Sequence, residues 1–345
     1  MSLIESVYAK LKRHPKRIVF PDGADPRVIR ACHIFYEKDA GIPILIGKRD
    51  VIERVALAEK ANLDHVAIID PETSSDLPQF CRILERLGRY KKLEVTDARA
   101  LMLNPNYFGA MMLQNGQADA LVGGMSSYAG SLLRPLIQLV KPMPHASIIS
   151  GCMIAEMADK SFGDDGVLFL ADCGVVPDPT MEQLASIALQ TALVARQVFG
   201  ARPRVAMLSF STKGSAHTPS TEKVAGAVEL VRELATKMGV EIAVDGEMQV
   251  DAALVPNLAA TKMGASLVAG RANVLIFPDL NSGNIAAKII QYMGGARVYG
   301  QILLGLSHPA AELSRGATSE EIASVAALVG LKAIEYRKLY PDIGA

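Results

Sequence analysis

Short apolar runs rich in β-branched residues alternate with longer amphipathic stretches along most of the chain. In the first part the apolar runs lie at residues 17–21, 43–47, 65–69 and 120–123. Helical patterns lie between them at 26–40, 51–61, 77–87, 95–103 and 107–115. Apolar strands separated by helices are typical of a parallel sheet covered on both faces. The sequence therefore predicts an α/β lobe here, preceded by an amphipathic segment at 3–13.

The alternation continues in the second part of the chain. Strands are expected at 148–154, 167–172, 205–209, 242–245, 273–277 and 299–306, the first two joined by a hairpin turn at 163–166. Helices are expected at 180–199, 221–238, 282–293 and 318–340, with another beginning at 251. Because no repeat or long linker separates the halves, we expect two α/β lobes with a cleft between them. Residues 1–145 with 300–345 are expected to form the first lobe, and 146–299 the second.

Composition narrows the class of protein. With 345 residues the chain is too long for one ordinary core, and its 36 basic residues balance 36 acidic ones. This balance does not favour nucleic acid as a partner, and no apolar run is long enough to cross a bilayer. The N-terminus lacks the pattern of a signal peptide, so we expect a cytoplasmic protein with small-molecule partners.

The four cysteines and six histidines are dispersed. No Cys-x-x-Cys or His-x-x-x-His pair occurs, so neither a zinc site nor a disulfide framework is predicted. We expect the cysteines to be small buried apolar residues of a reducing compartment.

The stretch 313–321, Leu-Ser-Arg-Gly-Ala-Thr-Ser-Glu-Glu, holds the densest group of chemically active side chains. Thr318 is a plausible N-cap of the last helix, and free N–H groups at a helix start favour anions. Arg315 adds a forked donor that matches phosphate or carboxylate. The same residues also fit a capping box in which Glu321 accepts from the Thr318 N–H, so capping and catalysis both stay open.

Two polar stretches follow apolar strands in the second part of the chain. Residues 209–216 present hydroxyls, Lys213 and a glycine, which suit an anion cradle as well as an ordinary polar loop. Residues 277–285 open a helix, where Asn281 or Ser282 would serve either as a cap or in binding. Open α/β sheets place ligand sites at such strand ends.

Two further stretches carry candidate chemistry. Residues 122–128 place glycines and serines at a strand end, suited to a phosphate or a pantetheine chain, and continue to Arg134. The acids of 245–251 would bind a metal or form a turn with an N-cap at Asp251; the structural alternative is favoured. The whole inventory suits a phosphorylated or acidic substrate.

Several of these motifs together resemble the phosphate acetyl/butyryltransferase family. They are 209–215, 245–247 with 251–253, 277–285 and 313–316, with Pro21-Asp22-Gly23 and Pro26-Arg27 near the N-terminus. They follow in the family's order over nearly the whole chain, and 278–284 is more similar to the acetyl-specific members.

The resemblance implies reversible transfer of an acetyl group between acetyl-CoA and inorganic phosphate. The thiolate of coenzyme A would attack acetyl phosphate directly in a ternary complex, with no tightly bound cofactor and no metal. The implied fold is that of the isocitrate/isopropylmalate dehydrogenases, assembled as a homodimer through the second lobe.

Matching positions imply roles for individual residues. Arg315 would hold the phosphoryl group or polarise the acetyl carbonyl, Ser314 would donate near that carbonyl, and Glu321 would take the thiol proton. Arg134 would contact coenzyme A or phosphate. The remaining substrate-binding candidates are Ser211, Thr212, Lys213, Ser215, Asn281, Ser282 and Asn284.

Three positions depart from the family pattern. Ala317 stands where cysteine is usual, Glu321 where aspartate is usual, and Gly88 where an arginine is expected, with Arg86 or Arg89 as substitutes. The alternatives are therefore a phosphate butyryl- or propionyltransferase, a catalytically weak acyl-CoA-sensing module, or a nicotinamide-dependent dehydrogenase on the same fold.

Overall fold

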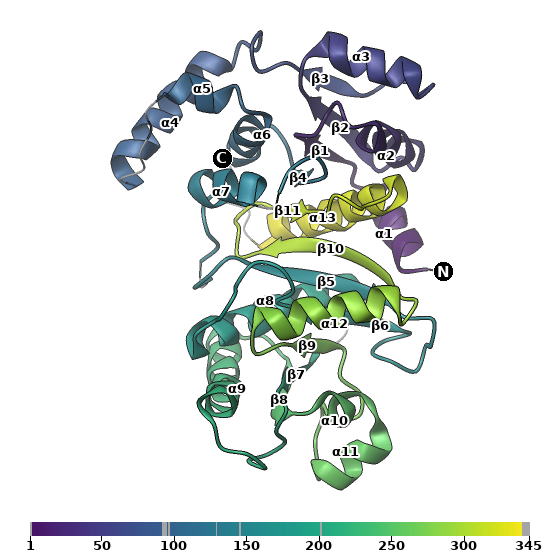
Figure 1. Cartoon of the computed structure of the whole chain (residues 1–345), viewed down its shortest axis with the longest axis vertical. Helices are drawn as coiled ribbons and strands as arrows, with labels where there is room; N and C mark the ends of the chain where they lie inside the picture. The colour runs from purple at the N-terminus through teal and green to yellow at the C-terminus, as the bar shows by residue number, and fades with distance from the viewer. Residues whose placement is uncertain are drawn as a thin grey trace. The chain divides into compact units, whose positions relative to one another are not determined.

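The computed structural model describes residues 2–91, 95, 97–128, 130–144, 146–200 and 202–339. The chain divides into two compact units (Figure 1). The first comprises Met1–Pro142 with Leu306–Ala345, and the second comprises Met143–Gly305. Along the described residues, no helix is both long and apolar enough to span a bilayer.

The first unit is built on five strands in the order β3-β2-β1-β4-β11, and every neighbouring pair is parallel. The strands are β1 (Lys16–Phe20), β2 (Gly41–Ile46), β3 (Ala67–Ile69), β4 (Ala120–Gly123) and β11 (Ala310–Glu312). From β1 the chain moves outward to β2 and β3, then returns to place β4 on the other side of β1. The point between β1 and β4 is therefore a topological switch point, where α/β sheets bind ligands.

Helices cover this sheet. They are α1 (Leu3–Leu11), α2 (Pro26–Glu37), α3 (Arg49–Ala58), α4 (Leu77–Lys91), α5 (Ala98–Met102), α6 (Pro105–Gln114), α7 (Gly130–Leu139) and α13 (Ser319–Leu339). The last helix, α13, packs on α1, α2, β1 and β4, whereas α6 packs on β1, β2, β4 and α7. The C-terminal helix thus joins the core made by the first 140 residues, which the sequence predicted for this helix.

The second unit contains six strands in the order β10-β5-β6-β9-β7-β8. They are β5 (Ser150–Glu156), β6 (Val167–Ala171), β7 (Arg204–Leu208), β8 (Ala243–Met248), β9 (Val274–Ile276) and β10 (Arg297–Leu304). The helices are α8 (Met181–Phe199), α9 (Pro219–Met238), α10 (Val250–Leu254), α11 (Pro256–Lys262) and α12 (Leu280–Tyr292). Buried residues of β6, β7, β9 and α12 form its apolar core.

The expected hairpin between β5 and β6 is confirmed, because the two strands pair antiparallel from Cys152↔Ala171 to Glu156↔Val167. The strand expected near 299–306 begins at Arg297 and pairs antiparallel with β5, within the second unit, rather than returning to the first. Strands β10, β5 and β6 thus form an antiparallel ribbon, unlike the parallel strands of the first unit.

The turn and the helix N-caps predicted in two polar stretches, 245–251 and 277–285, were wrong. Asp245, Gly246 and Glu247 lie inside β8 and not in a turn. Asp251 lies within the first turn of α10, whose N-cap is Gln249, and its carboxylate pairs with Lys262 at 2.6 Å. The N-cap of α12 is Asp279, whose side chain accepts from the Ser282 N–H, and not Asn281 or Ser282.

Candidate active site

Three loops at the carboxyl ends of β1, β4 and β11 carry the polar residues of the first unit. Parallel pairing aligns these ends, because Glu312 of β11 lies opposite Gly123 of β4, and Val19 of β1 opposite Leu121. The loop after β11 is held to β4 by the Leu313 N–H, which donates to the Gly123 carbonyl at 2.9 Å. Side chains distant in sequence therefore meet at one edge of one sheet.

Ser314 and Arg315 are both exposed in the loop between β11 and α13. Among the described residues, neither side chain has a hydrogen-bond partner or an ion pair, while a 3.1 Å bond from the Ala317 N–H to the Ser314 carbonyl fixes the turn. A hydroxyl and an unpaired guanidinium thus face solvent beside a helix start, which suits an anionic substrate.

Glu321 forms the capping box that the sequence allowed. Its Oε2 accepts from the Thr318 N–H at 2.8 Å, and its own N–H donates to Thr318 Oγ1 at 3.2 Å. The carboxylate is partly exposed at the start of α13. The capping role is confirmed, and the catalytic role of Glu321 stays a prediction.

Asp22, directly after β1, fills the small-residue loop that follows β4. The backbone N–H groups of Gly124, Met125 and Ser126 donate to its carboxylate at 2.9, 3.3 and 3.2 Å. These N–H groups form the kind of nest that attracts an anion. In this structure the chain supplies that anion itself.

Glu312, the last residue of β11, adds a second carboxyl beside this loop. A Cβ placed on Gly124 would lie 3.1 Å from Glu312 Oε1, and the glycine has φ +101°. No described residue hydrogen-bonds or pairs with the Glu312 side chain. Burial and the negative charge of Asp22 raise the pKa of Glu312 above its usual value.

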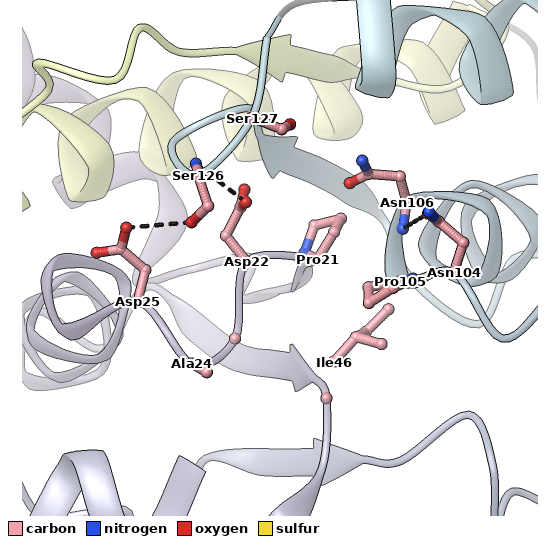
Figure 2. A pocket seen from close by; sticks show the side chains of 12 residues that line it. Pro21, Asp22, Ala24, Asp25, Ile46, Asn104, Pro105, Asn106, Ser126 and Ser127 are labelled. Atoms are coloured by element: carbon pink, nitrogen blue, oxygen red, sulfur yellow. Dashed lines mark hydrogen bonds between the residues drawn. The ribbon is translucent and has the colours of Figure 1, made fainter. Parts of the chain in front are cut away.

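A pocket of about 430 Å³ opens at the switch point between β1 and β4 (Figure 2). Its lining residues are Pro21, Asp22, Gly23, Ala24, Asp25, Ile46, Gly47, Asn104, Pro105, Asn106, Ser126 and Ser127. Gly23 packs closely against the backbone of Ile46, because a Cβ on Gly23 would lie 2.5 Å from the Ile46 carbonyl oxygen. Ser127 Oγ is buried and has no hydrogen-bond partner among the described residues.

Arg134 is exposed on α7 and has no partner among the described residues. Its charge partly offsets the burial that raises the pKa of nearby Tyr107. Gly88 is buried within α4, whereas Arg86 and Arg89 are exposed on the same helix. The exposed Arg86 and Arg89 stay the candidates for the missing cation.

The loop after β7 in the second unit is also occupied by the chain's own carboxylate. Glu247, only 4% exposed, accepts from Ser211 Oγ at 2.9 Å and from the Gly214 N–H at 2.8 Å through the same oxygen. Ser215 Oγ contacts Ser211 Oγ at 3.1 Å and accepts from the Thr212 N–H at 3.0 Å. Donors of this loop thus converge on Glu247, and binding of a substrate anion there stays a prediction.

Lys213 is paired as well. Its Nζ donates to Asp245 Oδ1 at 2.6 Å and to the Gly246 carbonyl at 2.9 Å. Partial burial acts against ionisation, yet hydrogen bonds from Lys213 and Ser266 hold the pKa of Asp245 below its usual value. Thr212 Oγ1 accepts from the Gln249 N–H at 3.0 Å, so this loop is braced from several sides.

The 281–284 stretch has mainly structural contacts. Asn284 Nδ2 donates to the Cys173 carbonyl at 2.9 Å, and Ser282 Oγ donates to the Asp279 carbonyl at 2.8 Å. Gly283 admits a close approach, since a Cβ there would lie 2.0 Å from the Asp172 carbonyl. Asn281 is exposed, and no described residue hydrogen-bonds its side chain.

The cysteines are not disposed for nucleophilic chemistry. None of the four forms a disulfide bond, and burial raises the pKa of Cys32 and Cys173 well above the usual range of a thiol. Within the described ranges, no three His, Cys, Asp or Glu side chains are grouped to hold a metal ion.

Comparison with known proteins identifies the chain's relatives. Residues 2–329 match the family model described as phosphate acetyl/butaryl transferase. The chain belongs to this family. It is 41% identical to the phosphate acetyltransferase of Thermoanaerobacterium thermosaccharolyticum over 96% of this chain and 100% of that protein. A phosphotransacetylase structure from Streptococcus pyogenes covers 97% of this chain and 100% of its own, with 36% identity and a TM-score of 0.87.

These likenesses confirm the mixed α/β fold and an acyltransferase activity for this family member. The dehydrogenase-like architecture agrees with a more distant neighbour described as a 4-hydroxythreonine-4-phosphate dehydrogenase from Salmonella typhimurium. That structure has a TM-score of 0.53 and 13% identity, and covers 92% of this chain and 99% of its own. At this identity the likeness shows the fold alone.

Sequence reasoning about this transferase missed three groups in the first unit: the Asp22 carboxylate, the Arg27 guanidinium and the Glu312 carboxyl. Pro21-Asp22-Gly23 directly after an apolar strand was a usable signal, because polar residues at such strand ends meet ligands. Glu312 gave no signal, since its strand, Ala310–Glu312, contains no β-branched or aromatic residue.

Proposed function

We propose that this acyltransferase moves an acetyl group reversibly between acetyl-CoA and inorganic phosphate, giving acetyl phosphate and coenzyme A. The observation that carries the proposal is the full-length likeness to phosphate acetyltransferases. It is supported by the exposed, unpaired Ser314–Arg315 pair at a sheet edge. This site offers what an acyl phosphate requires, a forked cation and a hydroxyl beside a helix start.

The proposed reaction is direct attack in a ternary complex. Glu321 takes the proton of the coenzyme A thiol, and the thiolate sulfur adds to the acetyl carbonyl carbon. The carbonyl electron pair moves to oxygen, then returns as the carbon–oxygen bond to phosphate breaks and phosphate leaves with its electrons. Arg315 and Ser314 stabilise the negative charge on the oxyanion and the phosphoryl group.

Coenzyme A is proposed to bind along the first unit. Arg134 is an exposed cation suited to one of its phosphates. The pocket of Figure 2 contains two carboxylates, which repel phosphates but accept hydrogen bonds from amide or adenine N–H groups. We therefore assign the uncharged part of coenzyme A to the pocket, with the unpartnered Ser127 hydroxyl as one contact.

Roles for the second-unit candidates also remain proposals. Ser211, Thr212, Lys213 and Ser215 line a cradle in which a phosphate would have to compete with Glu247 and Asp245. Asn281 is the free polar group of the 281–284 stretch, and Ser282 and Asn284 would act by shaping the loop. The predicted cleft between the lobes remains a prediction of the same kind.

A homodimer in the cytoplasm is proposed for the whole protein. Its interface would lie in the second unit, where Ile285, Ile289 and Tyr292 of α12 and its C-cap Met293 are each more than half exposed. Their spacing places them along one face of the helix. The four free cysteines agree with a reducing compartment.

The test is coenzyme A-dependent consumption of acetyl phosphate, compared with propionyl and butyryl phosphates. We expect acetyl phosphate to give the highest kcat/KM, and Arg315→Gln to lower it about 100-fold or more with little change in melting temperature. Preference for butyryl phosphate would instead assign the protein to the phosphate butyryltransferases. Coenzyme A binding without turnover would instead support the acyl-CoA-sensing module, which the substitutions at Gly88 and Glu321 motivate.

A further inference from the structure

Arg27, the second residue of α2, ties together the three loops at the carboxyl edge of the first unit. Its Nε and Nη2 form a fork on Asp25, with distances of 3.1 and 2.7 Å. Nη2 also donates to the Met125 carbonyl at 3.0 Å, and Nη1 to the carbonyls of Arg315 and Ala317 at 2.5 and 3.2 Å. All five donors of a guanidinium are thereby used.

Holding a carbonyl also fixes the N–H of the same peptide. A trans peptide is planar, so its N–H points away from its carbonyl oxygen. Two of the three N–H groups fixed in this way by Arg27 have carboxylate acceptors from the chain. The Ser126 N–H donates to Asp22 at 3.2 Å, and the Thr318 N–H donates to Glu321 at 2.8 Å.

The third N–H belongs to Gly316, and no described residue accepts from it. The space beside Gly316 is open as well. Apart from its two chain neighbours, the only described atom within 4 Å of a Cβ built on this residue is Ser314 Oγ, at 3.8 Å. The loop thus presents a fixed, unpaired donor next to Ser314, with room for a substrate atom.

We infer that Arg27 is a positioning residue, which holds the 315–316 peptide so that the Gly316 N–H donates to the oxyanion of the reacting acyl group. The inference rests on the proposed acetyl transfer. When the thiolate sulfur bonds to the carbonyl carbon, the carbonyl oxygen gains the electron pair and accepts from this N–H. The bond strengthens as the charge develops, so it lowers the barrier more than it improves substrate binding.

The test compares Arg27→Lys with Arg17→Lys. Lysine keeps the charge but cannot span three carbonyls and a carboxylate with one nitrogen. Arg17 is a matched control in the same unit, because it forks onto Asp119 at 3.2 and 3.3 Å and donates to the Gly116 carbonyl at 2.9 Å, near the start of β1. We expect Arg27→Lys to lower kcat about 100-fold, as loss of one oxyanion donor does, with KM for both substrates within about threefold. Arg17→Lys should leave kcat within about twofold.

A second variant tests the Gly316 N–H without changing Arg27, so that a folding defect of Arg27→Lys does not decide the outcome. Gly316→Ala adds a methyl group that meets no atom closer than 3.8 Å, so the fold should hold while the space beside the N–H is partly filled. We expect kcat to fall at least about tenfold with an unchanged melting temperature.

Three results would overturn the inference: equal kcat in the two lysine variants, a rise in KM in place of a fall in kcat for Arg27→Lys, or full activity of Gly316→Ala. Failure of the proposed function looks different, because the unmodified protein would then not turn over acetyl phosphate.

Discussion

Glu321 caps α13 with the same carboxylate that we propose as the general base. Capping uses Oε2, which accepts from the Thr318 N–H, and leaves Oε1 without a partner among the described residues. The two roles are therefore compatible in geometry, because a carboxylate has lone pairs on both oxygens. A substitution can distinguish the two roles, since a glutamine can cap the helix but cannot act as a general base.

Glu321→Gln tests the base at the residue scale. We expect kcat to fall about 100-fold or more, the usual contribution of a general base, while the melting temperature changes little. The matched control is Glu5→Gln in the equivalent capping box of α1, where Ser2 and Glu5 exchange bonds of 2.7 and 3.3 Å. Near-normal turnover of Glu321→Gln would leave this residue only its role as a cap.

Glu312 predicts a pH dependence of stability. Burial and Asp22 raise its pKa in the folded protein, so folding favours the protonated form. The stability that this carboxyl contributes is present below its unfolded pKa and is lost as the pH rises through the folded pKa. Above the folded pKa, the ionised, unpartnered side chain therefore destabilises the fold.

Glu312→Gln should consequently raise the melting temperature at pH 7–8, and the gain over the unmodified protein should shrink toward pH 4. Thermal melts across this range measure it, with the exposed Glu320→Gln as control. The prediction fails if the gain in melting temperature is the same at every pH, or if Glu312→Gln lowers the melting temperature at pH 7–8.

At the scale of elements, local composition and caps decided what the sequence pattern revealed, since the three-residue β3 and β9 were predicted and β11 was not. Long helices such as α8 and α9 begin at Thr180 and Thr218 caps and end at Gly200 and Gly239, signals that are local in the sequence. The three-residue β11 and the short α11 gave no comparable pattern. Strand β8 runs through Gly246, because pairing with β7 outweighs the turn tendency of Asp-Gly.

The exposed stripe of α12 gives a prediction at the same scale. If it is the dimer interface, Ile289→Arg should raise the dimer dissociation constant about 100-fold or more, because an unpaired buried charge costs about 3–5 kcal/mol. Sedimentation velocity of the full chain measures this shift. Leu57→Arg on α3 is the control, since Leu57 is 79% exposed and no other exposed large apolar residue lies on that helix. A dimer unaffected by Ile289→Arg would place the interface elsewhere.

On the scale of the whole molecule, the two units share a way of stabilising their loops. Each has a glycine- and serine-containing loop at a strand end whose N–H groups attract an anion, and each supplies a carboxylate for it. Asp22 fills the loop that follows β4, about a hundred residues later, and Glu247 fills the loop that follows β7. Such pairs connect segments distant in sequence, so they could not be predicted from either loop alone.

The sequence by itself determined the alternation of strands and helices, the α/β class and the family, because periodicity, caps and ordered motifs are properties of short segments. It also named Ser314 and Arg315, which the structure leaves exposed and unpaired. Only the tertiary structure decided which polar loops are already satisfied, that Arg27 joins three loops, and that Glu312 lies half-buried beside Asp22. These facts depend on β4, which pairs with β1 on one side and β11 on the other and so brings together segments nearly 300 residues apart.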